Sequence, residues 1–216
     1  MFINGEEIIL IVDYLNSSNL EYIFLRNINR EIPYRIPIGK DIDILIKEAD
    51  KHIFLRFFRK HHYKIIAHPL RNDIFLYGVN RFIQIEHNVS GIIFDIMFQI
   101  AVRSLDAGQW VPLDQRIQKS AWHNRRFQQV NGSFGYWTLG YDDEFVTLVS
   151  RAIFDKRKFQ SAYIQRLKDL LPKVNMDKVE KKLYMIFFKY TPFLLKSMCG
   201  GDFGNIIKEQ LSFKGY

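Results

Sequence analysis

Two carboxylates stand two residues apart in Asp41-Ile42-Asp43, at the start of an apolar stretch that ends at Ile46. Charged and apolar residues alternate here at period two, which predicts a half-buried β-strand. Residues i and i+2 of a strand project from the same face, so we expect Asp41 and Asp43 to point the same way. Adjacent carboxylates repel each other unless a cation or a proton lies between them, and hard oxygen ligands suit Mg²⁺ or Mn²⁺. The alternative is a pair of solvated acids on a surface strand.

A third acid, Glu86, lies in the later strand-like segment Phe82-Ile83-Gln84-Ile85-Glu86-His87. Gln84 and Glu86 share a face opposite the isoleucines of this segment. We therefore predict that Glu86 completes a metal site with Asp41 and Asp43, or acts as the base that takes a proton from an attacking hydroxyl. Asp95, within Ile92-Ile93-Phe94-Asp95-Ile96, is the alternative third carboxylate.

The elements that must position these acids follow from apolar periodicity and turn residues. In the first 90 residues we expect a helix at 6–17, a strand at 22–25, a long loop at 26–40, a strand at 41–46, a helix at 47–62, a strand at 63–67 and hairpin strands at 73–77 and 81–87. This order predicts an α/β unit around a mixed or antiparallel sheet.

The last third of the chain has the periodicity of helices, which we expect near 142–154, 159–171, 176–189 and 205–211. Three acids at Asp142-Asp143-Glu144 suit a helix N-terminus. Between the two regions, we interpret residues 106–140 as a crossing segment with an exposed basic loop. The predicted fold class is therefore α+β, with an α/β catalytic domain at 1–105 followed by a helical domain at 141–216.

Charge is unevenly distributed over the 216 residues, whose formal net charge is +8. Residues 1–105 hold 13 basic and 12 acidic side chains, whereas residues 106–216 hold 18 basic and 11 acidic ones. A basic half beside a carboxylate cluster suits a polyanion such as a nucleoside triphosphate or RNA. A solvated basic helix face is the alternative explanation.

Two further features bound the class of protein. The single cysteine, Cys199, excludes an internal disulfide framework and a cysteine-based zinc site. The longest apolar runs are far shorter than the ~20 residues of a membrane span. We therefore expect a soluble, cytoplasmic protein; the sequence predicts no oligomeric state.

Two strand segments carry a resemblance to a known family. The segment Tyr22-Ile23-Phe24-Leu25-Arg26, followed after a loop by the Asp41-Ile42-Asp43 strand and later by Glu86, resembles the polymerase-beta-type nucleotidyltransferase superfamily. More narrowly it is similar to a bacterial group of uncharacterised nucleotidyltransferase-like proteins, whose helical second domain the segments 142–148 and 152–159 also resemble. The resemblance implies two metal ions, Mg²⁺ or Mn²⁺, held by Asp41, Asp43 and Glu86.

The same resemblance implies a reaction. A nucleotidyl or related phosphate-linked group would pass from a nucleoside triphosphate to a small-molecule or saccharide acceptor. The superfamily usually places Gly-Ser or Gly-Gly after the first strand to cradle the triphosphate, but this chain has Arg26-Asn27 there. We expect Arg26, Asn27, Lys40 and Lys156 to contact phosphate. For Lys156 the alternative is a cation at a helix C-terminus.

Two other functions stay open at the level of sequence. In one, the acceptor is RNA, such as a tRNA end, which would account for the basic second half. In the other, the chain is a non-catalytic descendant of the fold that binds a ligand or a partner, as the missing glycine suggests.

Overall fold

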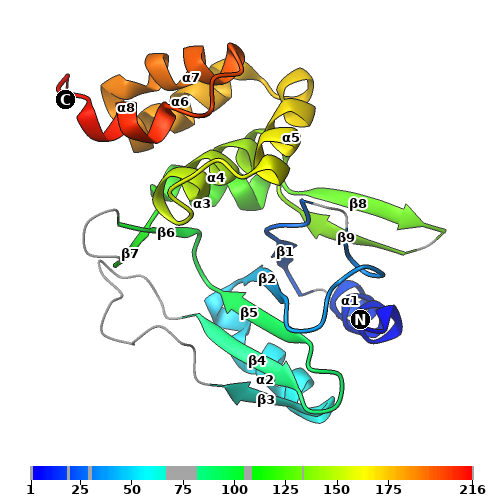
Figure 1. The fold of residues 1–216 in the computed structure, drawn as a ribbon. Helices are drawn as coiled ribbons and strands as arrows, with labels where there is room; N and C mark the ends of the chain where they lie inside the picture. The colour runs from blue at the N-terminus through cyan, green and yellow to red at the C-terminus, as the bar shows by residue number, and fades with distance from the viewer. Residues whose placement is uncertain are drawn as a thin grey trace. The chain divides into compact units, whose positions relative to one another are not determined.

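The computed structural model describes residues 2–18, 20–28, 31–66, 82–104, 109–132 and 134–215. The chain forms two compact units (Figure 1). The first unit comprises residues 1–100 and 125–139, and the second unit comprises residues 101–124 and 140–216. The expected hairpin strand at 73–77 lies outside the described residues.

The first unit is organised around a seven-stranded mixed sheet with the order β3-β4-β5-β2-β1-β9-β8. Its strands are β1 (Tyr22–Phe24), β2 (Asp41–Ile46), β3 (Tyr63–Ile66), β4 (Ile83–His87), β5 (Ile93–Met97), β8 (Arg126–Asn131) and β9 (Phe134–Thr138). The pairs β2–β5 and β1–β9 are parallel, and the other neighbours are antiparallel. The two central strands, β2 and β5, therefore run in the same direction side by side.

Helices α1 (Gly5–Ser17) and α2 (Lys51–Lys60), the latter preceded by a 3₁₀ turn η1 (Glu48–Asp50), cover one face of this sheet. Ile42, Ile44 and Ile46 of β2 enter the core shared with both helices. The rings of Tyr14 and Phe57 stack with centroids 3.6 Å apart and join α1 to α2. Because side chains alternate along a strand, Asp41 and Asp43 project from the opposite face of β2.

The hairpin of β8 and β9 differs from the expected exposed loop within residues 106–140. Thr138 of β9 is the parallel partner of Phe24, and its Oγ1 donates a hydrogen bond of 3.0 Å to the carbonyl oxygen of Phe24. Phe134 and Tyr136 are buried in the core of the first unit, whereas β8 is largely exposed. The polar residues of β8 gave this segment the composition of a loop, and its apolar partner strand is what anchors it.

The second unit contains one two-stranded sheet and a set of helices around α4. Its described elements are β6 (Ala101–Arg103), β7 (Trp110–Pro112), α3 (Gln115–His123), α4 (Tyr141–Phe154), α5 (Ser161–Leu170), η3 (Leu171–Lys173), α6 (Met176–Phe187), η4 (Phe188–Tyr190), α7 (Thr191–Cys199) and α8 (Ile206–Ser212). Residues of α4 contact α3, α5, α6 and β6. Ten of its fourteen residues are buried, so α4 is the core helix of this unit.

Buried ion pairs connect α4 to its neighbours. Asp143 accepts hydrogen bonds from Lys182 Nζ at 2.7 Å and from Ser120 Oγ at 3.0 Å. Glu144 accepts two parallel hydrogen bonds from the guanidinium of Arg166, at 2.7 and 2.8 Å. The acids expected to begin this helix therefore also act as structural links, because buried carboxylates need hydrogen-bonding partners.

The observed architecture matches the predicted α+β class, with a mixed sheet flanked by helices and a mainly helical C-terminal region. None of the helices in the described ranges has the length and apolar character that a membrane crossing requires.

Candidate active site

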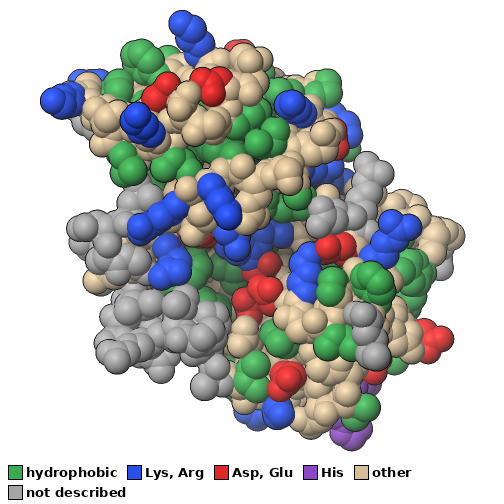
Figure 2. Space-filling model, in the orientation of Figure 1, with side chains coloured by type: hydrophobic (Ala, Val, Ile, Leu, Met, Phe, Trp, Pro, Cys, Tyr) green, Lys and Arg blue, Asp and Glu red, His purple; other side chains and the backbone are tan. Residues whose placement is uncertain are grey.

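Three carboxylates meet where β2 and β5 lie side by side. Asp43 and Asp95 are direct register partners in this parallel pair, and Asp41 lies one step away on the same face. Oxygen atoms of Asp41, Asp43 and Asp95 all lie within 4.8 Å of one another. Asp43 is buried and Asp95 partly buried, whereas Asp41 is exposed. Figure 2 shows acidic side chains gathered near the centre of the drawn face, where Figure 1 draws β2 and β5.

Asp95 is the carboxylate whose proton affinity is most changed by this arrangement. Burial, together with the neighbouring carboxylate of Asp41, raises the pKa of Asp95 to about 7. Gln84 of the adjacent strand β4 opposes this change by donating a hydrogen bond of 2.7 Å to Asp95 Oδ1. Negative charge is thus concentrated at this position, and a proton or a metal ion would stabilise it.

Arg26 supplies a positive charge directly at the carboxylates. It follows β1, and its Nη2 atom forms an ion pair with Oδ1 of Asp43. The Arg26 side chain is only 11% exposed, and its Nε is buried without a hydrogen-bond partner among the described residues. Arg26 therefore reaches the predicted site, and one of its donors lies there buried and without an acceptor among the described residues.

Asn27 and Lys40, both expected to contact phosphate, have other partners in the structure. Oδ1 of Asn27 accepts hydrogen bonds from the backbone N–H groups of Glu31, at 2.6 Å, and Ile32, at 3.2 Å, and its amide donates to the hydroxyl of Tyr136. Lys40 forms an ion pair with Glu31. In this state both side chains organise the loop between β1 and β2.

Glu86 is not brought into the carboxylate cluster. Its register partner on β5 is Ile93, and its side chain pairs with Lys64 of β3 at 3.2 Å, partly open to solvent. The register places Gln84, not Glu86, opposite Asp95. The third carboxylate of the cluster is therefore Asp95, our alternative, and the two-residue offset along β4 explains why Glu86 is absent from it.

Lys156 lies in the second unit, just after α4, where its side chain is exposed. Its backbone N–H donates to the carbonyl of Arg151, five residues earlier, at 2.9 Å, which closes the C-terminal end of α4 with a wider turn. This position suits a cation at a helix C-terminus. A role of Lys156 in phosphate binding stays a prediction.

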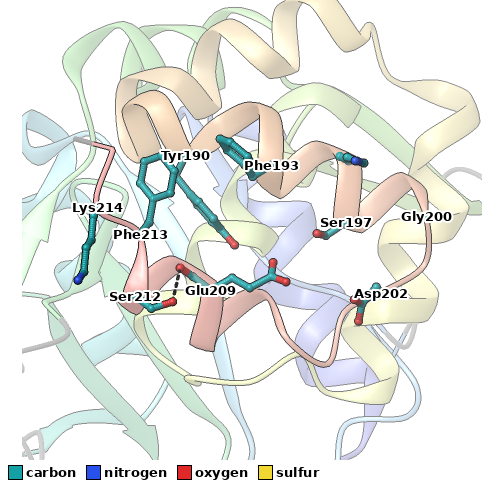
Figure 3. A pocket seen from close by; sticks show the side chains of 10 residues that line it. Tyr190, Phe193, Ser197, Gly200, Asp202, Glu209, Ser212, Phe213 and Lys214 are labelled. Atoms are coloured by element: carbon teal, nitrogen blue, oxygen red, sulfur yellow. Dashed lines mark hydrogen bonds between the residues drawn. The ribbon is translucent and has the colours of Figure 1, made fainter.

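The second unit contains a cleft of about 760 Å³ between α7 and α8. Three aromatic rings, those of Tyr190, Phe193 and Phe213, gather at one end of it, and Glu209 points into its middle (Figure 3). Lys196 also lines the cleft, so its lining mixes aromatic rings with both signs of charge. Such a lining suits binding of a flat or charged group more than catalysis by paired acids.

The cluster of Asp41, Asp43 and Asp95 has the donor set of a hard divalent cation. Mg²⁺ and Mn²⁺ bind carboxylate oxygens, retain several waters and contact substrate phosphates. Burial is the main cause of the raised pKa of Asp95 and the carboxylate of Asp41 adds to it, and a bound cation would oppose both effects by stabilising the ionised form. Strands on a rigid sheet also hold such ligands more precisely than loops do.

The fold is similar to that of solved polymerase-beta-type nucleotidyltransferases, at low sequence identity. The solution structure of the antibiotic-resistance factor ANT(2'')-Ia is 8% identical, has a TM-score of 0.52 and covers 91% of this chain and 96% of its own. The crystal structure of ANT(2'')-Ia in complex with adenylyl-2''-tobramycin is 10% identical and has a TM-score of 0.53. The match covers 84% of this chain and 96% of that chain. No family profile and no curated protein sequence matches the chain.

Proposed function

We propose that this protein is a metal-dependent nucleotidyltransferase, which transfers a nucleotidyl group from a nucleoside triphosphate to a hydroxyl of a small-molecule or saccharide acceptor. The observation that supports this most directly is the convergence of Asp41, Asp43 and Asp95 within 4.8 Å on neighbouring strands of a nucleotidyltransferase fold.

The proposed reaction joins an acceptor oxygen to the α-phosphorus of the nucleotide and releases pyrophosphate. Asp41, Asp43 and Asp95 would hold Mg²⁺ or Mn²⁺, which supplies electrostatic stabilisation of charge on the phosphate oxygens. Arg26 would donate hydrogen bonds to phosphate from the place where the superfamily usually has a glycine-bearing loop. Lys156 is proposed as a further phosphate contact.

The chemistry of the acceptor is constrained by charge. The crystal structure of ANT(2'')-Ia is a complex with adenylyl-2''-tobramycin, so a saccharide acceptor is the first class to test. The net charge of +8, however, disfavours long-range attraction of a polycation. We therefore propose neutral or anionic saccharides ahead of aminoglycosides, with tobramycin as a comparison in the same screen.

A melting experiment followed by a transfer assay tests this function. The protein would be melted with Mn²⁺, with a nonhydrolysable nucleoside triphosphate, and with both. Binding to the folded state raises the melting temperature. A ligand present at about 100 times its Kd adds ~2.7 kcal/mol to the free energy of unfolding. We expect a larger rise with both ligands than the two separate rises combined. A strict absence of metal-dependent nucleotide binding would contradict catalysis and favour the non-catalytic alternative.

A second candidate acceptor is RNA, favoured by features of the second unit. This unit, residues 101–124 and 140–216, holds 17 basic and 11 acidic side chains. Phe193, 54% exposed, lines the cleft of Figure 3, as do Lys196 and Lys214, and aromatic rings with cations in the same cleft can stack on bases. RNA binding through these groups should weaken steeply as salt rises. A flat response to salt would favour a small acceptor.

A further inference from the structure

Arg26 gives the carboxylate cluster a permanent positive charge. Its guanidinium forms an ion pair with Asp43, and the Arg26 side chain is nearly as well buried as its partner. A guanidinium does not lose its proton in proteins, so this charge persists at every pH at which the protein is folded. Removing either member of such a pair would leave an uncompensated buried charge.

The position of Arg26 is fixed by its neighbours on both sides. The backbone N–H of Leu25 donates to the carbonyl oxygen of Asp43 at 3.1 Å, which continues the pairing of β1 with β2. Asn27 is held through its side chain by the backbone of Glu31 and Ile32. Arg26 therefore lies between two anchored residues and is an integral part of the site.

The charge balance of the cluster then limits how many metal ions it can hold. Three carboxylates carry three negative charges when ionised, and Arg26 neutralises one of them. One divalent ion neutralises the remaining two. A second divalent ion would therefore depend on the phosphates of the bound nucleotide for its balancing charge, and it would lie at short range from a guanidinium that keeps its own charge.

We propose that Arg26 takes the place of one of the two metal ions, so that the site works with a single divalent ion and a resident arginine. This inference rests on the proposed function. Asp41 and Asp95 would provide most of the ligands for that ion, because Oδ1 of Asp43 is engaged by Arg26.

The unpartnered donor of Arg26 indicates what the arginine does for a substrate. Its Nε is buried and has no acceptor among the described residues, while Nη2 is engaged by Asp43. A guanidinium presents its donors in a fixed plane, so an acceptor at Nε is positioned relative to Asp43. A phosphate oxygen of a bound nucleotide would supply the acceptor that this buried donor lacks. Arg26 would thus link the carboxylate cluster to the phosphates, which is the role of a metal ion in two-metal sites.

Counting metal ions in the complete protein tests this proposal without an activity measurement. Equilibrium dialysis with Mn²⁺ and α,β-methylene-ATP gives the number of Mn²⁺ ions bound per bound nucleotide. The variants are R26M, which removes the charge and keeps the length, and R26K, which keeps the charge but lacks the guanidinium fork. Arg56→Met, at an exposed position on α2, is the matched control.

We expect one Mn²⁺ per nucleotide in the wild type, R26K and Arg56→Met, and two in R26M. R26K should bind the nucleotide about tenfold more weakly, because it loses one charge-assisted hydrogen bond. Two ions in the wild type, or one ion in R26M, would overturn the proposal and leave the proposed function intact. If R26M does not fold or bind nucleotide, the numbers of Mn²⁺ ions per nucleotide in the wild type and in R26K decide. One ion in each protein supports the proposal, and two ions in either protein overturn it. Absence of metal-dependent nucleotide binding in the wild type would overturn both.

Discussion

Asp43 on β2 and Asp95 on β5 are register partners across a parallel strand pair, and they place two carboxylates on one face of the sheet. Adjacent strands lie ~4.8 Å apart, which brings such side chains close together. Asp41 adds a third carboxylate from the same strand as Asp43. This concentration of charge is unfavourable without a cation, and four expected outcomes follow from it and from its surroundings.

Neutralising any of the three carboxylates should abolish transfer. We expect D41N, D43N and D95N each to slow metal-dependent pyrophosphate release by about 10²- to 10⁴-fold, because each removes a charge that holds the metal ion. The same variants should lose the metal-dependent part of the melting shift produced by nucleotide. Circular dichroism serves as the folding control, and a variant with the wild-type rate would exclude its carboxylate from the site.

Glu86 provides a matched control within the same sheet. Its side chain pairs with Lys64 and lies outside the cluster. We expect E86Q to keep transfer within about twofold of the wild type and to change stability by less than ~1 kcal/mol, as is usual for exposed ion pairs. A loss in E86Q as large as that in D95N would restore Glu86 as the third catalytic carboxylate.

The raised pKa of Asp95 predicts a pH-dependent cost in the metal-free protein. In the folded state the pKa of Asp95 is about 7, above its ordinary value of 3.8, so the folded protein binds this proton more tightly than the unfolded chain does. The contribution of Asp95 therefore lowers the free energy of unfolding as pH rises from about 4 to 7, and this loss is complete above pH 7. The residue in D95N does not titrate, so this variant escapes the loss.

We expect the stability gained by D95N to be about 2–3 kcal/mol larger at pH 8 than at pH 5 in buffer containing a chelator. Urea denaturation of the two proteins at both pH values measures this difference. Groups that do not interact with Asp95 contribute equally to both proteins and cancel, so the difference reports Asp95 together with the neighbouring carboxylate of Asp41. A gain that is the same at the two pH values would show that Asp95 titrates below this range.

Asn27 should contribute to stability through the loop that follows Arg26. N27A leaves the backbone N–H groups of Glu31 and Ile32 without their acceptor, and each lost hydrogen bond of this kind costs about 1–3 kcal/mol when the donor is buried. N27D keeps the acceptor oxygen and should cost less. Urea denaturation distinguishes the two, and equal stability of N27A and the wild type would contradict the structural role.

Local pattern in the sequence predicts β2 well. The alternation in residues 41–46 identified the strand with its observed bounds, and period two placed Asp41 and Asp43 on one face. The helix 142–154 was similarly clear, because its apolar residues and acidic first turn are local signals. The structural similarity to polymerase-beta-type nucleotidyltransferases confirms the expected fold.

The partner of β2 could not be derived from local pattern. The third carboxylate depends on which strand pairs with β2 and in which register, and that pairing joins residues about 50 positions apart. The one local sign was Asp95 itself, an acid inside the apolar run 92–96. The hairpin of β8 and β9 was not predicted from the sequence for a related reason, since it is anchored to β1 by a long-range contact of Thr138 with Phe24.

The first unit is discontinuous in sequence, which has a consequence for its synthesis. Until Thr138 has left the ribosome, one edge of β1 has no neighbouring strand, although β2 has been available since residue 46. An uncovered strand edge is a template for aggregation. A fragment ending at residue 105 would keep all three carboxylates and still lack the strand that closes this edge. Because the β8–β9 hairpin completes this sheet late, we expect the growing chain to depend on chaperones during translation. We expect fragments that end before β9 to be insoluble.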